Sequence, residues 1–91
     1  MKINSRTTES FRRLLSKLPV DIRRAANESY KLFRNDPTHR SLNFKPLKGL
    51  PDLYSARISY GYRVVGRMRP DGIVWFWVGS HADYDRLLER S

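Results

Sequence analysis

The sequence predicts an α+β domain in which an N-terminal helical hairpin packs on a small antiparallel β-sheet and a short helix ends the chain. Three patterns support this prediction. Apolar residues recur at helical spacing before Pro37, apolar and polar residues alternate from Tyr54 to Met68, and residues 73–78 are apolar without interruption. The chain has 91 residues, which suits one domain with a single core spanning the whole chain, residues 1–91.

Two helices are expected in the N-terminal half, after a short edge strand at residues 2–5. The candidate caps of the first helix are Thr7, Thr8 and Ser10. Pro19 ends this helix, and Asp21 opens the second. The second helix ends at residues 35–37, because a residue before proline avoids the α region. The link between the two helices is so short that they form an antiparallel hairpin. The apolar stripes of this hairpin need a sheet or another helix to cover them.

Four strands are expected to follow. The first, over residues 42–47, contains Pro46, which places it at an edge of the sheet. Residues 54–59 and 62–69 each alternate a core face with a largely cationic face, and residues 73–78 form a central strand that is apolar on both faces. A capping box then opens a last helix, which packs through two leucines. These residues are Ser80, Asp83, Leu87 and Leu88.

The register of the second and third strands decides which residues share a face. A two-residue turn would set Arg57 opposite Val64 and mix charge with core. A three-residue loop over residues 59–61 instead pairs Ile58 with Tyr62 and Arg57 with Arg63, which keeps the apolar sets together. Two guanidinium groups side by side repel unless an anion lies between them. The pair is therefore either a phosphate clamp or two solvated arginines that an acidic partner neutralises.

The composition favours an anionic partner. The formal net charge is +9, from 18 Lys and Arg against 9 Asp and Glu, and a field of that sign attracts nucleic acid, an acidic protein, or both. Cysteine is absent, which excludes disulfides, thiol nucleophiles and zinc–thiolate sites. His39 and His81 are far apart and near no carboxylate cluster, so neither a metal site nor a cofactor is expected. With no signal sequence and no apolar run of ~20 residues, a cytoplasmic protein without membrane contact is expected.

The order and spacing of several motifs resemble the RelE/ParE superfamily of type II toxins, small basic proteins usually paired with an antitoxin. The motifs are Leu-Pro between the helices, Asp36-Pro37, the Lys-Pro-Leu-Lys-Gly run at residues 45–49, the Arg57-to-Arg63 spacing with Tyr62-Arg63-Val-Val, and a final strand leading into Gly79-Ser-His-Ala-Asp-Tyr84. The resemblance implies a curved antiparallel sheet with two helices on one face. RelE-like members cut messenger RNA in the ribosomal decoding site without metal, whereas ParE-like members poison DNA gyrase, so the fold does not decide the function.

For the cleaving branch, the resemblance implies a role for each candidate residue. Arg57 and Arg63 would hold the scissile phosphate, which suits bidentate guanidinium donors. His81 would transfer protons, and Tyr84 would stack on a base or support the phosphate. The expected RNA-binding cations are Lys45, Lys48 and Arg67.

The chain departs from the family pattern at the general base. Some family nucleases use a glutamate on the first sheet strand, but this chain has Lys45 there and no carboxylate between Asp36 and Asp52. His81, or else a tyrosine such as Tyr84 or Tyr62, is then the expected base. Trp75 and Trp77 could stack on bases but are expected in the core. The role of Tyr60 and Tyr62 beside the arginine pair is left open.

The sequence thus predicts a ribosome-dependent mRNA endonuclease toxin that inhibits translation and is neutralised by an acidic antitoxin covering the basic face. The alternatives are a non-catalytic toxin that binds DNA gyrase and an inactive family member. His81 favours the nuclease, because pure protein binding does not require an imidazole beside a phosphate clamp.

Overall fold

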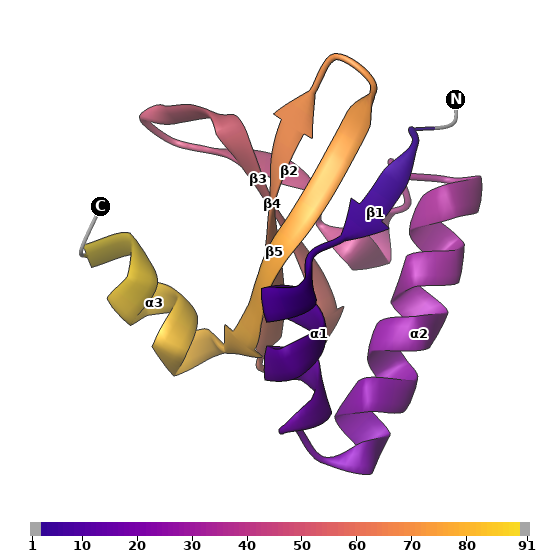
Figure 1. The fold of residues 1–91 in the computed structure, drawn as a ribbon, viewed down its shortest axis with the longest axis vertical. Coiled ribbons are helices and arrows are strands. Elements are labelled where there is room, and N and C mark those ends of the chain that lie inside the picture. The colour runs from indigo at the N-terminus through magenta and orange to yellow at the C-terminus, as the bar shows by residue number, and fades with distance from the viewer. Residues whose placement is uncertain (1–2, 90–91) are drawn as a thin grey trace.

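The structure, a computed structural model, describes residues 3–89 and confirms the α+β class. In chain order the elements are β1 (Ser5–Thr7), α1 (Glu9–Ser16), α2 (Val20–Asn35), the 3₁₀ helix η1 (Arg40–Leu42), β2 (Lys45–Leu47), β3 (Leu50–Ser59), β4 (Tyr62–Arg69), β5 (Gly72–Ser80) and α3 (His81–Glu89). Helices α1 and α2 lie on one side of the sheet, and α3 lies on the other (Figure 1).

The helical hairpin forms as expected, with small differences at its ends. Of the three candidate caps, Thr8 is the one used, since its hydroxyl accepts a hydrogen bond from the backbone N–H of Phe11 at 3.1 Å. Helix α2 begins at Val20, one residue before the expected Asp21, because Pro19 occupies the capping position and fixes the backbone there.

The five strands are ordered β1-β5-β4-β3-β2. Strands β2 to β5 pair antiparallel as predicted, but β1 runs parallel to β5, so the sheet is mixed. The strand predicted at residues 2–5 instead spans Ser5–Thr7, and Lys2 lies outside the described residues. Two hydrogen bonds place this segment: Ile73 N–H donates to the Asn4 carbonyl oxygen at 2.8 Å, and the Tyr30 hydroxyl donates to the Ser5 carbonyl oxygen at 2.9 Å.

Strand β2 is shorter than the predicted strand over residues 42–47, because η1 takes up Leu42. Asn43 then adopts a left-handed backbone conformation, with φ of 47°, which turns the chain into β2. Strand β2 forms an edge of the sheet, as Pro46 required.

Apolar side chains cover both faces of the sheet. The face toward α1 and α2 holds the larger cluster: Phe11, Ala26, Phe33, Leu42, Ala56, Ile58, Val64, Ile73, Trp75 and Val78. The opposite face holds a smaller one, built from Leu47, Val65 and Tyr84, against which the predicted contacts Leu87 and Leu88 pack. Trp75 is buried in the first cluster and Trp77 packs against the second, which confirms that both belong to the core. The face that was predicted to be exposed and cationic is therefore partly covered by α3.

The β3–β4 hairpin keeps the predicted arginine pairing by a different route. Arg57 pairs with Arg63, as predicted, but Ser59 rather than Ile58 pairs with Tyr62. The turn is therefore only two residues long, and a β-bulge between Arg57 and Ser59 absorbs the extra residue. The three-residue loop was wrong, because the bulge restores the face alternation that a two-residue turn alone would have inverted.

Among residues 3–89, no helix has the length and apolar character needed to cross a lipid bilayer.

Candidate functional site

The candidate site is centred on the paired arginines of neighbouring strands. Arg57 of β3 lies beside Arg63 of β4, and Arg63 in turn lies beside Gly79 of β5. Both arginines are half-buried. Gly79 has no side chain, and the ring of Trp77 fills part of the space, since a Cβ placed on Gly79 would lie 2.7 Å from it. The row of paired residues across β3, β4 and β5 thus consists of two arginines and a glycine.

Within residues 3–89, no carboxylate forms an ion pair with either arginine. Arg57 donates from Nε to the carbonyl oxygen of Ser41 at 3.2 Å, which orients its guanidinium and leaves both terminal nitrogens without a partner among residues 3–89. The described residues form five ion pairs. None of them includes the five cations predicted for the site: Arg57, Arg63, Lys45, Lys48 and Arg67. Two adjacent guanidinium groups with free donors are suited to binding a phosphate or a carboxylate.

His81 follows Gly79 of the row across β3, β4 and β5 by two residues along the chain. It is the first residue of α3, and its backbone N–H donates to the Gly61 carbonyl oxygen at 2.7 Å, which ties α3 to the β3–β4 turn. Its Nε2 lies 3.6 Å from a carboxylate oxygen of Asp85, and both side chains are about half exposed.

Asp85 is a single carboxylate partner of His81 that was not predicted from the sequence. Asp85 follows His81 by four residues, so the two side chains meet once the segment forms a helix. The four-residue spacing of His81 and Asp85 in the sequence is the signal that could have predicted this pair. Asp85 is placed to orient the imidazole.

Tyr84 takes a different position from the one predicted. Its side chain is 8% exposed and packs with Leu47 and Val65, with its ring centroid 6.4 Å from Trp77 and 6.1 Å from His81. Stacking of Tyr84 on a base is therefore wrong for this conformation, because α3 already buries the ring. The Tyr84 hydroxyl has no hydrogen-bond partner among residues 3–89. Every buried side-chain oxygen or nitrogen in these residues does have a partner, so the Tyr84 hydroxyl must reach solvent.

The remaining cations lie at increasing distance from the arginine pair. Lys45 pairs with Ser55 and is a diagonal neighbour of Arg57, about 7–8 Å away at the backbone. Arg67 is four residues along β4 from Arg63, or about 13 Å at ~3.3 Å per residue. Lys48 lies in the β2–β3 turn, at the opposite end of β3 from Arg57 and roughly 20 Å from it. Lys48 and Arg67 are exposed but are not brought to the arginine pair.

The N-terminus of α3, which holds His81 in place, is capped by its own side chains. Asp83 N–H donates to the Ser80 hydroxyl at 3.2 Å, as the predicted capping box requires. Arg86 hydrogen-bonds to the Asp83 carboxylate, and this contact, with a further one from Ser80, lowers the pKa of Asp83.

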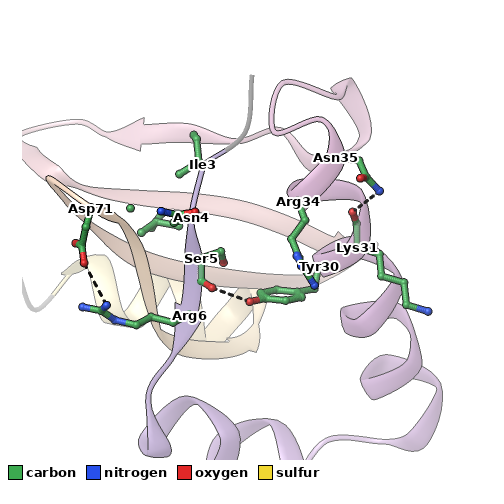
Figure 2. Close-up of a pocket in the computed structure, with 11 residues that line it drawn as sticks. Ile3, Asn4, Ser5, Arg6, Tyr30, Lys31, Arg34, Asn35 and Asp71 are labelled. Carbon is green, nitrogen blue, oxygen red and sulfur yellow. Dashed lines mark hydrogen bonds and ion pairs between the residues drawn. The ribbon is translucent and has the colours of Figure 1, made fainter.

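A cavity of about 780 Å³ lies away from the arginine pair, between β1, the second half of α2 and the β4–β5 turn (Figure 2). It is lined by three cations, of which Arg6 pairs with Asp71 at 3.3 Å while Lys31 and Arg34 come from α2. None of the predicted site residues lines it. The arginine pair lies instead on the sheet face that α3 partly covers, with both side chains half-buried.

Within residues 3–89, no three His, Asp or Glu side chains gather as a metal ion requires.

Solved structures with this fold are toxins, several of them bound to antitoxins. The toxin–antitoxin complex RelBE2 from Mycobacterium tuberculosis contains a chain that is 29% identical, with a TM-score of 0.70 over 89% of this chain and 100% of that one. The RelB–RelE complex from Methanococcus jannaschii matches with 22% identity and a TM-score of 0.71, over 88% of this chain and 95% of that one. The free toxin RelE from E. coli, as a substituted variant, matches with 21% identity and a TM-score of 0.67, over 99% and 98%. The fold therefore belongs to the class of small toxins of toxin–antitoxin systems.

A family model places the chain within that class. The model for the ParE-like toxin domain matches residues 20–86, so the chain belongs to this family and is a toxin of the RelE/ParE superfamily. No curated protein sequence matches the chain.

Proposed function

We propose that this toxin is a ribosome-dependent endonuclease that cuts messenger RNA without a metal ion and acts in the cytoplasm. The observation that carries the proposal is the pair Arg57–Arg63, two adjacent guanidinium groups that no carboxylate within residues 3–89 neutralises. A phosphodiester supplies the anion that such a pair lacks, and its charge grows as the reaction proceeds. Guanidinium donors placed where charge develops stabilise the transition state.

The proposed reaction is attack by the ribose 2′-hydroxyl on the adjacent phosphorus. The bond from the 2′-oxygen to phosphorus forms as the bond to the 5′-oxygen of the next nucleotide breaks, which leaves a cyclic phosphate and a 5′-hydroxyl. A base removes the proton of the 2′-hydroxyl, and an acid gives a proton to the leaving oxygen. His81 is the proposed proton-transfer group, because it follows Gly79 of the arginine row by two residues and its ring faces Asp85.

Tyr84 and three lysine or arginine side chains complete the proposed site. The Tyr84 hydroxyl supports the phosphate from the edge of α3, while the ring stays in the core. Lys45 contacts the RNA backbone next to the arginine pair, and Lys48 and Arg67 contact it farther away or bind the ribosome.

An acidic antitoxin is the proposed partner that silences the site. The solved complexes from M. tuberculosis, M. jannaschii and Pyrococcus horikoshii each pair a toxin of this fold with an antitoxin. The net charge of +9 and the unneutralised cations around Arg57 favour an acidic segment that lies across them and occupies the phosphate position.

A second candidate function is inhibition of DNA gyrase, the activity of the ParE-like branch. The observation in its favour is the family model itself, which is ParE-like. Gyrase inhibition requires only protein contacts, so it gives no reason for His81 and Asp85 to lie beside the arginine pair.

The test compares both activities in one preparation. Toxin is mixed with ribosomes programmed with a defined mRNA, in the presence of a chelator, and single-turnover cleavage is measured together with the chemistry of the new ends. We expect cyclic or 3′-phosphate ends from the intact toxin. Arg57→Ala and Arg63→Ala should each slow cleavage by about 10² to 10³ and abolish growth inhibition while the protein stays folded. Absence of cleavage, together with gyrase trapped on DNA in a supercoiling assay, would establish the second candidate instead.

A further inference from the structure

Tyr60 occupies the tip of the β3–β4 turn and is 98% exposed. Val20, at 59%, is the other large apolar side chain of residues 3–89 that is exposed. The Tyr60 ring has no aromatic neighbour, and its hydroxyl makes no hydrogen bond within the described residues. Its ring therefore contributes almost nothing to the stability of the fold.

The turn that presents Tyr60 is held from both sides. Ser59 pairs with Tyr62 directly behind it, and Gly61 takes a left-handed backbone conformation, with φ of 91°. The Gly61 carbonyl oxygen also accepts the hydrogen bond from His81 N–H at 2.7 Å. The turn backbone is thus fixed relative to α3, so the exposed ring is carried on a preorganised support.

The position of the turn places the backbone of Tyr60 close to the candidate site. Tyr60 is three residues from each of Arg57 and Arg63 along the hairpin, which corresponds to roughly 7–10 Å at ~3.3 Å per residue. Its chain neighbours Ser59 and Gly61 are small and uncharged. A projecting aromatic ring beside two cations is the arrangement with which proteins bind single-stranded nucleic acid, stacking a base while the cations hold the backbone.

We propose that Tyr60 stacks on the base of a nucleotide adjacent to the scissile phosphate and so fixes the RNA strand for cleavage. The inference rests on the proposed nuclease function and deepens it, because it assigns base contact to a residue other than Tyr84, whose ring is buried. Every base offers a π-face, so the contact favours single-stranded RNA with little sequence preference. A protein partner is the less favoured occupant, because tyrosines that dominate protein interfaces lie in packed centres, whereas this ring stands alone on a narrow turn.

The test is a double-mutant cycle between Tyr60 and the RNA, with single-turnover cleavage of ribosome-bound mRNA as the readout. Tyr60→Ala should lower kcat/KM by about 5- to 150-fold, the range that corresponds to loss of one base-stacking contact. An abasic nucleotide on one side of the cleaved phosphate should lower cleavage by wild type to the same extent. Combining the two changes should cause no further loss.

Four further variants separate stacking from other roles. Tyr60→Phe and Tyr60→Trp should cleave like wild type, whereas Tyr60→Leu should behave like Tyr60→Ala, because it is apolar but has no π-face. Val20→Ala is the matched control for loss of an exposed apolar side chain, and it should cleave like wild type. Tyr60→Ala should keep the wild-type melting temperature, since the ring is 98% exposed.

The outcomes that overturn the inference differ from the one that overturns the function. Additive effects of Tyr60→Ala and of abasic nucleotides on both sides would exclude the stacking contact while leaving the nuclease function in place. Normal cleavage by Tyr60→Ala with weakened binding of the antitoxin would identify the ring as a protein contact. No cleavage by wild type would overturn the nuclease function, and this inference with it.

Discussion

At the scale of single residues, His81 and Asp85 form a unit that the proposed chemistry needs. General acid or base catalysis contributes about 10² to 10⁴ in rate, so His81→Ala should slow single-turnover cleavage by a factor in that range. Asp85→Asn should slow cleavage by less, because the imidazole remains but loses the carboxylate 3.6 Å away that orients it. Asp52→Asn, which changes an exposed carboxylate of β3 without an ion pair within the described residues, is the control.

Combining the two substitutions distinguishes a functional pair from two separate surface residues. If Asp85 acts only through His81, the double variant should cleave no more slowly than His81→Ala alone. Independent, multiplying effects would contradict this arrangement. Unchanged cleavage by His81→Ala would move the proton transfer to the hydroxyl of Tyr84 or of Tyr62.

The residues of the site differ in how far the sequence could predict them. The pairing of Arg57 with Arg63 was predictable, because only that register keeps the apolar side chains on one face. Burial of Tyr84 was not, since it depends on α3 folding back over Val65, a tertiary contact that no local pattern encodes. The hydrogen bond from Arg57 to the Ser41 carbonyl oxygen likewise joins segments that only the folded chain brings together.

At the scale of elements, β1 depends on a glycine that no other residue can replace. A Cβ on Gly72 would lie 2.3 Å from the Asn4 carbonyl oxygen, and its φ of 139° is unfavourable for any other residue. Gly49 also has a positive φ, of 79°, but nothing lies within 4 Å of its Cβ position.

These two glycines make a matched pair of variants. Gly49→Ala should cost about 1–2 kcal/mol of unfolding free energy from backbone strain alone. Gly72→Ala should cost about 1–3 kcal/mol more, because the clash pushes β1 off β5. In a domain of this size each kcal/mol lowers the melting temperature by about 4–8 °C, so differential scanning calorimetry resolves the difference. Equal losses would show that β1 adjusts to the extra methyl group without cost.

Helix α3 should weaken in acid because of its cap. Hydrogen bonds from Arg86 and Ser80 lower the folded-state pKa of Asp83 below its ordinary value of 3.8. The stabilisation from this carboxylate is therefore present above that value and is lost as the pH falls through the lower folded-state pKa. Urea unfolding of wild type and Asp83→Asn from about pH 7 to about pH 3 should show a difference that is constant near neutrality and shrinks below about pH 4. A difference that does not change with pH would contradict this assignment.

The elements themselves were largely predictable, and their exceptions have local causes. Helical spacing located α1 and α2, strand alternation located β3 and β4, and the uninterrupted apolar run located β5. Strand β3 begins at Leu50, four residues before the predicted strand, where a turn over residues 49–52 was expected. The parallel pairing of β1 was not predictable, since it depends on backbone hydrogen bonds between distant segments, such as Ile73 N–H to Asn4 and Thr8 N–H to Trp75, rather than on apolar spacing. The bulge at Ile58 was also missed, because turn length and bulge compensate for each other in the sequence pattern.

At the scale of the whole molecule, some cations have a carboxylate partner and others do not. On the helical side, Arg13 pairs with Glu9 at 3.1 Å and Lys31 lies 3.9 Å from Glu28. On the sheet, neither Lys45 nor Arg63 has a carboxylate partner within residues 3–89. Lys45 and Arg63 therefore lack the local neutralisation that Arg13 and Lys31 have, so an acidic partner can pair with them directly.

This asymmetry predicts where and how an acidic antitoxin binds. If its segment lies across the sheet cations, the dissociation constant of the complex should rise steeply between about 0.05 M and about 0.5 M salt, as the charges become screened. The double variant Lys45→Gln/Arg63→Gln should bind more weakly and with a flatter salt dependence. Arg13→Gln/Lys31→Gln removes the same net charge from the helical side, so it should keep most of the affinity and the slope. Isothermal titration calorimetry of the three proteins checks this, and equal effects of the two double variants would show that the antitoxin responds to total charge rather than to the site around Arg63.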